Sequence, residues 1–198
     1  MANKIIITAL RDEASPIIDF YNLSRDTKQS DLKVYANNKY SLLITGVGRK
    51  KVSDTLPIYL KRIYNPDSIL INIGIAGGNP HSTKIGNMYY IDKLTSELSN
   101  NEYSFPVIDK INIDKIGLIT VEKNINKNDN KIYKELVDME AAVITDIAIK
   151  YCDITKIKIL KIVSDHMNNI DWSNLNIRKL IQSNIDSISN IIKLYERC

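Results

Sequence analysis

Hydrophobic and polar positions along the chain form two kinds of segment, short apolar runs and longer amphipathic stretches. The apolar runs predict strands at residues 4–9, 32–36, 40–45, 69–78, 88–94, 116–121, 137–139 and 157–163. A helix is expected to begin within residues 10–16 and to run to about residue 21, and others are expected at 49–63, 140–151 and 175–196. Alternating strands and helices are typical of an α/β fold.

Residues 69–78, Ile-Leu-Ile-Asn-Ile-Gly-Ile-Ala-Gly-Gly, join a β-branched apolar run to three glycines. The run predicts a strand that is buried on both faces. Because Gly74, Gly77 and Gly78 lack a Cβ atom, we expect positive φ angles and a corner that lets a ligand approach main-chain N–H groups. Ligands of open α/β sheets bind beyond the carboxyl ends of the strands, so this corner is the first candidate for a binding site. The plain alternative is that these glycines only turn the chain.

Three acidic residues, Glu13, Glu140 and Asp165, each follow a predicted strand. If the sheet is mostly parallel, the ends of these strands meet at one edge, and the three carboxylates converge on the glycine corner. Glu13 and Glu140 also lie where a helix is expected to begin, and carboxylates there often cap the helix or complement its dipole. Asp165 follows an apolar strand and has Ser164 and His166 beside it, so capping explains it less well, although a loop-capping aspartate is the alternative.

Composition narrows the classes of function. The 198 residues are 44% hydrophobic and 25% charged, as in one globular domain, and the net charge of +4 is spread along the chain, which argues against nucleic-acid binding. Cys152 and Cys198 form no disulfide framework, and the two histidines, His81 and His166, have no ligand spacing, so we expect no metal and no cofactor. No apolar run approaches the ~20 residues of a membrane span, and we expect a cytoplasmic protein.

Two nucleotide-binding motifs are incomplete. Gly46-Val47-Gly48 follows a predicted strand as in a dinucleotide-binding fingerprint, but position 51 is lysine where the third glycine allows close helix packing. The Gly-Lys-Ser/Thr sequence of phosphate loops is absent. Both observations argue against a dinucleotide-dependent oxidoreductase and a phosphate-loop hydrolase.

Six short segments, taken in order, resemble the purine nucleoside phosphorylase and nucleosidase superfamily, above all its methylthioadenosine/S-adenosylhomocysteine nucleosidases and futalosine hydrolases. They lie at residues 9–13, 45–48, 72–78, 85–87, 137–142 and 163–165, and the match extends from residue 4 to the last helix. The resemblance implies a single nucleoside phosphorylase-like domain at 1–198, a three-layer α/β fold with a central twisted mixed sheet flanked by helices. It also implies a hydrolase that cleaves the N-glycosidic bond of an adenosine-type purine nucleoside, with or without a 5′ modification.

The same resemblance implies roles for individual residues. Asp165 protonates or hydrogen-bonds the purine at N7 and Ser164 orients it, whereas Glu13 positions and deprotonates the attacking water. Glu140 binds the ribose hydroxyls and Met139 packs against the sugar. The remaining substrate contacts come from the glycine corner, at Ile75, Ala76 and Gly77. Relatives complete their sites with residues of a neighbouring subunit, so the resemblance also implies a homodimer or higher homo-oligomer.

Departures from the family leave alternatives open. Phosphorylases of the hexameric type carry an arginine where Asn72 stands and a serine where Ile75 stands, and their absence favours water over phosphate as the nucleophile. Arg11 and Arg49 lie next to predicted strand ends, where either side chain could reach a bound phosphate. Cleavage by phosphate is therefore the first alternative to hydrolysis. A purine-binding module without catalysis is the second, and the three carboxylates argue against it.

Three features have no assignment from the sequence. Residues 95–114 show weak periodicity and no clear element, and the polar residues 122–130 form either a lid or a connector, with composition favouring the connector. The aromatic residue that stacks on adenine in relatives has no clear counterpart within residues 121–126.

Overall fold

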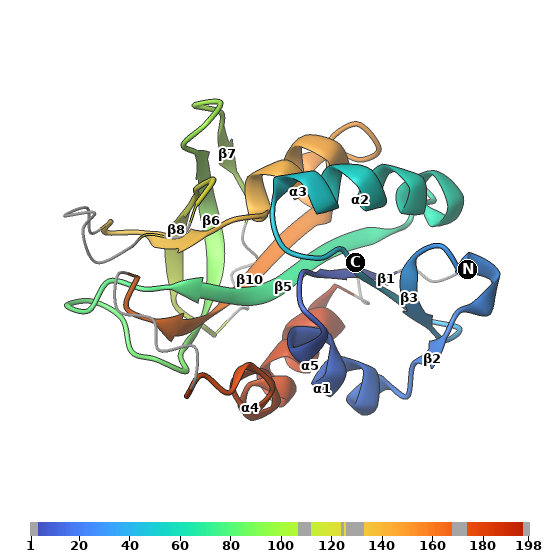
Figure 1. Cartoon of the computed structure of the whole chain (residues 1–198), viewed down its shortest axis with the longest axis horizontal. Coiled ribbons are helices and arrows are strands. Elements are labelled where there is room, and N and C mark those ends of the chain that lie inside the picture. The colour runs from blue at the N-terminus through green and yellow to red at the C-terminus, as the bar shows by residue number, and fades with distance from the viewer. Residues whose placement is uncertain (1–3, 107–111, 124, 126–132, 168–173, 196–198) are drawn as a thin grey trace.

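The computed structural model describes residues 4–106, 112–123, 125, 133–167 and 174–195, which form the elements labelled in Figure 1. The strands are β1 (Lys4–Thr8), β2 (Ser24–Arg25), β3 (Lys33–Ala36), β4 (Tyr40–Ile44), β5 (Ile69–Gly77), β6 (Met88–Ser96), β7 (Glu102–Ser104), β8 (Lys115–Thr120), β9 (Leu136–Asp138) and β10 (Ile157–Asp165). The α-helices are α1 (Arg11–Tyr21), α2 (Arg49–Ile63), α3 (Ala141–Ala148), α4 (Ile177–Ser183) and α5 (Ile185–Leu194). Short 3₁₀ turns span Thr27–Gln29 and Ile154–Lys156.

The strands form one mixed sheet, as the resemblance implied. β4, β1, β5 and β10 are parallel neighbours, and they present their carboxyl ends at one edge. The order β10-β6-β8-β9-β5 closes on itself because β10 also pairs with β5, so these strands form a barrel from which β1, β4, β3 and β2 extend. The expected arrangement, an open central sheet between two layers of helices, therefore applies only to the strands outside the barrel.

Helices lie on both sides of the sheet: α2 and α3 on one, and α1, α4 and α5 on the other (Figure 1). Successive residues of β5 belong to the two cores, since Leu70 lies in the same hydrophobic cluster as Leu56 of α2 and Ile71 lies in the same cluster as Ile17 of α1. Burial on both faces explains the continuous apolar runs in the parallel strands, where an alternating pattern would leave one face polar.

The end of the chain differs from the single helix expected at 175–196. Asn184 separates α4 from α5, and its side-chain amide donates to the carbonyl oxygens of Gly86 at 3.0 Å and Leu180 at 2.9 Å. The apolar periodicity continues across this break because Ile181 and Ile185 enter the same core. Periodicity alone could not locate the break, which depends on a contact with a distant turn; residue 196 lies outside the described residues.

The structure describes parts of the two segments for which the sequence offers no clear prediction, residues 95–114 and 122–130. Residues 95–96 complete β6, β7 pairs with β6, and residues 107–111 lie outside the described residues. Of the polar segment at 122–130, residues 124 and 126–130 also lie outside them, so the choice between lid and connector stays a prediction. None of the helices that the structure describes has the length and apolar content needed to cross a membrane.

Candidate active site

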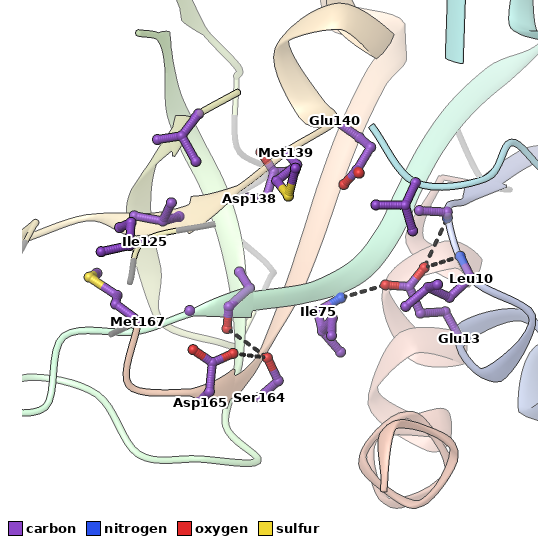
Figure 2. Close-up of a pocket in the computed structure, with 16 residues that line it drawn as sticks. Leu10, Glu13, Ile75, Ile125, Asp138, Met139, Glu140, Ser164, Asp165 and Met167 are labelled. Atoms are coloured by element: carbon purple, nitrogen blue, oxygen red, sulfur yellow. Dashed lines mark hydrogen bonds between the residues drawn. The ribbon is translucent and has the colours of Figure 1, made fainter. Parts of the chain in front are cut away.

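A cavity of about 230 Å³ opens at the carboxyl ends of β5 and β10 (Figure 2). Its lining includes all eight residues expected to catalyse or to bind substrate: Glu13, Ile75, Ala76, Gly77, Met139, Glu140, Ser164 and Asp165. These eight residues therefore lie together around one cavity.

Two of the three carboxylates reach the cavity as the parallel-sheet argument predicts. Glu13 follows β1 and Asp165 ends β10, and both strands run parallel to β5. Glu140 reaches it differently, because β9 is antiparallel to β5 and pairs with it through Val137 opposite Gly77. β5 extends beyond the last residue that pairs with β1, and β9 pairs with β5 in this extension. The prediction that Glu140 reaches the cavity from the end of a strand parallel to β5 is therefore wrong.

Asp165 lines the cavity, and its two carboxylate oxygens differ in their hydrogen bonds. The Ser164 hydroxyl donates to Asp165 Oδ2 at 2.6 Å, whereas Oδ1 is buried and has no hydrogen-bond partner among the described residues. Burial raises the pKa of Asp165 above its usual value, against the lowering effect of the Ser164 hydroxyl. A raised pKa favours the protonated form of a carboxyl group, which is the form that can donate a proton to a ligand.

The glycines of β5 act by a different means from the one expected. β5 continues to Gly77, and the positive φ angles of described glycines occur at Gly46, Gly48 and Gly86 instead. What matters is the missing Cβ atom: at Gly77 it would lie 3.1 Å from Asp165 Oδ1, and at Gly74 it would lie 2.9 Å from Glu13 Oε1. These glycines leave room for the two carboxylates against the strand.

Glu13 is fixed by backbone amides on both sides of the cavity edge. Its Oε2 accepts hydrogen bonds from the N–H groups of Ala9 and Leu10, and its Oε1 accepts one from Ile75, each at 2.9 Å. Burial raises its pKa, while the Leu10 amide and the ammonium of Lys161 lower it. Glu13 does cap α1, as the alternative reading supposed, but its bond to Ile75 also ties it to the cavity.

Glu140 precedes α3 without capping it. Its Oε1 accepts the N–H of Gly48 at 2.6 Å, and the start of the helix is capped by other side chains: Asp138 Oδ2 accepts from Ala141 N–H at 2.9 Å, and Thr120 Oγ1 from Ala142 N–H at 3.0 Å. Burial, together with the nearby charge of Asp138, raises the pKa of Glu140 to about 7. The second oxygen of Glu140 accepts no hydrogen bond from a described residue.

The sequence analysis missed Asp138 and Lys161, which form a buried ion pair in which Asp138 lines the cavity and Lys161 lies behind it. Lys161 Nζ lies 2.8 Å from Asp138 Oδ2, and the two side chains are 3% and 1% exposed. A signal for this pair was present, because a lysine within the apolar strand at 157–163 needs a buried counter-ion. The partner could not be chosen from the sequence, since several carboxylates follow other strands.

The end of the cavity opposite Glu13 and Glu140 is hydrophobic. It is formed by Val121, Ile125, Val137 and Met167, which pack together in one cluster (Figure 2). Met167 has a left-handed backbone with φ of 57° and is buried against Gly77, which has no Cβ to obstruct it. No described lining residue is aromatic, in agreement with the missing aromatic counterpart in the sequence.

Neither arginine considered for anion binding is among the residues that line this cavity. The guanidinium of Arg11 lies over the ring of Tyr35, 4.8 Å from its centroid, and Arg49 borders a smaller neighbouring cavity of about 60 Å³. The geometry therefore gives no support to an anion contact from either side chain.

The raised pKa of Glu140 predicts that the site costs stability at neutral pH. The pKa of Glu140 is about 7 in the folded protein, whereas its ordinary value is 4.5. The contribution of Glu140 to the stability of the folded protein is therefore complete below pH 4.5 and is lost as the pH rises through 7. Glu140→Gln should therefore raise the melting temperature at pH 8, by an amount equivalent to ~1–3 kcal/mol, and this gain should vanish near pH 4.5. Exposed Glu102→Gln is the control, and a loss of stability in Glu140→Gln at pH 8 would contradict the prediction.

No protein-family model matches the sequence, and no curated protein matches it significantly. Among solved structures, the chain is similar to a variant of an MTAN from Chlamydia trachomatis bound to MTA, with 21% identity and a TM-score of 0.77 over 98% of this chain and 100% of that chain. It is similar to 5′-methylthioadenosine nucleosidase from Arabidopsis thaliana in apo form, with 16% identity and a TM-score of 0.82 over 98% and 96%. It is also similar to a mutant futalosine hydrolase from Helicobacter pylori, with 12% identity and a TM-score of 0.75 over 98% of this chain and 99% of that chain.

The chain has the nucleosidase fold. This agrees with the superfamily that the six sequence segments resemble. The nucleosidase fold accounts for nearly all of this chain and of each compared chain. Because the compared structures include both MTA nucleosidases and a futalosine hydrolase, the fold does not select a substituent at C5′.

Proposed function

We propose that this protein hydrolyses the N-glycosidic bond of an adenosine-type purine nucleoside, with or without a 5′ modification, to free base and sugar. The observation that carries the proposal is that Asp165, whose buried Oδ1 has no hydrogen-bond partner among the described residues, lines one cavity with Glu13 and Glu140. The MTA bound to the Chlamydia trachomatis structure supports a nucleoside as the ligand.

Asp165 supplies the proton for the leaving base. As the C1′–N9 bond breaks, its electron pair moves onto the purine, and the purine takes a proton at N7 from Asp165 Oδ1. The hydroxyl of Ser164 keeps Oδ2 occupied, which leaves Oδ1 as the donor. The hydrophobic cluster around Met167 holds the base and excludes water from this proton transfer.

The carboxylates at the other end stabilise and trap the sugar. Positive charge develops on the sugar in the transition state, and negative charge nearby lowers the energy of that state. Glu140 accepts hydrogen bonds from the ribose hydroxyls and Met139 packs against the ring. The oxygen of a water molecule bonds to C1′ and Glu13 takes its proton, which balances the proton given by Asp165.

Water is favoured over phosphate because the cavity is lined by carboxylates. No described lining residue is arginine or lysine, and the ammonium of Lys161 below the cavity is already paired with Asp138. The side-chain amide of Asn72 is neutral, and its N–H donates a hydrogen bond to the Ile7 carbonyl oxygen at 3.1 Å. Asn72 therefore supplies no charge to the site. A phosphate dianion would lose its hydration without gaining a charged donor.

The test is base release from a panel of nucleosides in phosphate-free buffer, with methylthioadenosine, S-adenosylhomocysteine, adenosine and inosine as substrates. Free adenine from at least one of the first three, followed by chromatography, is the expected result. Tight binding of a nucleoside, measured by calorimetry, without any base release would instead identify a purine-binding module.

A further inference from the structure

Lys161 occupies a position where a charge is costly. It lies in the middle of β10 between apolar residues, and only 2% of it is exposed. Moving an ammonium group out of water costs several kcal/mol unless its partners compensate, and an apolar side chain at this position would avoid that cost. Packing alone therefore does not explain the lysine.

Asp138 has hydrogen-bond partners besides the lysine. Its Oδ1 accepts a hydrogen bond from the Thr120 hydroxyl at 2.6 Å, and its Oδ2 accepts one from Ala141 N–H at 2.9 Å. These bonds allow Asp138 to cap α3. The added ion pair at 2.8 Å instead fixes the position of the ammonium group.

The charges of three carboxylates raise the pKa of the Lys161 ammonium group. Besides Asp138 of β9, the charges of Glu13 on α1 and of Glu140 before α3 act on Lys161. A Cβ atom at Gly74 would lie 3.4 Å from Lys161 Nζ and 2.9 Å from Glu13 Oε1, so both groups are held against the same point of β5. These are the charged groups around Lys161 in the part of the chain that the structure describes.

We propose that Lys161, held in place by Asp138, is a positioning residue that keeps Glu13 and Glu140 ionised together when the nucleoside binds. The inference rests on the proposed function, in which one carboxylate activates water and the other binds ribose. Two buried carboxylates near a third, Asp138, repel one another and favour protonation. A buried cation beneath them offsets that repulsion, so both can be charged near neutral pH.

Carbon-13 NMR of the full-length protein, labelled at the glutamate carboxyl carbons, measures this directly. Glu13→Gln and Glu140→Gln assign the two signals, and pH titrations compare wild type with Lys161→Met. We expect Lys161→Met to raise both midpoints by about one pH unit, and to lower kcat/KM about tenfold on the acid side of the profile. Lys158→Met is the matched control, since Lys158 is buried on the same strand but lies over the Tyr195 ring, 4.7 Å from its centroid.

Unchanged midpoints in folded Lys161→Met would overturn the proposal, because a purely structural lysine changes stability without moving the titrations of Glu13 and Glu140. If Lys161→Met fails to fold, the double variant Asp138→Asn/Lys161→Met removes both buried charges. In that variant the midpoint of Glu140 should stay near its wild-type value, since it loses one attraction and one repulsion. The midpoint of Glu13 should still rise, and a fixed Glu13 midpoint would overturn the proposal.

The titrations do not depend on turnover. Shifted midpoints in a protein that releases no base would contradict the proposed function and leave the electrostatic role of Lys161 standing. Base release by wild type with unshifted midpoints in the variant would contradict the role of Lys161 alone. Lys161→Arg, which keeps a cation, should retain midpoints closer to wild type than Lys161→Met.

Discussion

Replacing Asp165 by asparagine is expected to lower kcat for base release by ~10² to 10⁴-fold. Asparagine keeps the shape of the side chain and can still accept the hydroxyl of Ser164, but it cannot give up a proton to the purine. Asp165 Oδ1 is buried and has no hydrogen-bond partner among the described residues, so we expect no neighbour to take over this step. KM should change much less than kcat.

Steady-state kinetics on the preferred nucleoside measures this effect, with exposed Asp67→Asn as the control. Burial raises the pKa of Asp165, so the amide variant should also be at least as stable as wild type near neutral pH. Turnover at the wild-type rate in Asp165→Asn would show that another group protonates the leaving base.

Glu13→Gln is expected to lower kcat by ~10²-fold or more, because the amide cannot take the proton of the attacking water. The side chain also loses one of its three amide hydrogen bonds, since the NH₂ group of glutamine cannot accept from a backbone N–H. A small loss of stability should accompany the loss of rate. Binding of the intact nucleoside should persist, because Glu140 and the hydrophobic end are unchanged.

Calorimetric titration of Glu13→Gln with the substrate separates the two effects. Retained affinity with slow turnover assigns Glu13 to the chemical step. Wild-type turnover in this variant would remove Glu13 from the mechanism, and a folded variant that no longer binds the nucleoside would make it a binding residue instead. Glu102→Gln, on an exposed strand end, is the matched control.

The sequence predicts the parallel part of the site well. Apolar runs locate β1, β5 and β10, and the rule that parallel strands share a carboxyl edge brings Glu13 and Asp165 together. α2 has the predicted bounds because its start follows Gly48 and its end precedes the turn at 65–67. Such features depend on local pattern, which a single sequence contains.

The parts that could not be predicted depend on contacts between distant segments. β9 pairs with β5 through one residue, and the barrel closes only because β10 pairs with both β5 and β6. Likewise, the partner of Lys161 is 23 positions away on a different strand. Gly74 and Gly77 were recognised as important, but their role in making room for side chains required knowledge of which side chains approach them.

The identity of the nucleophile tests the central claim most directly. The preferred nucleoside is incubated with enzyme in phosphate-free buffer and again with millimolar phosphate, and free base, reducing sugar and sugar 1-phosphate are quantified. Because carboxylates line the cavity and no described lining residue is cationic, free sugar should form at the same rate in both buffers. Base release that requires phosphate and yields the sugar 1-phosphate would contradict a hydrolase and identify a phosphorylase.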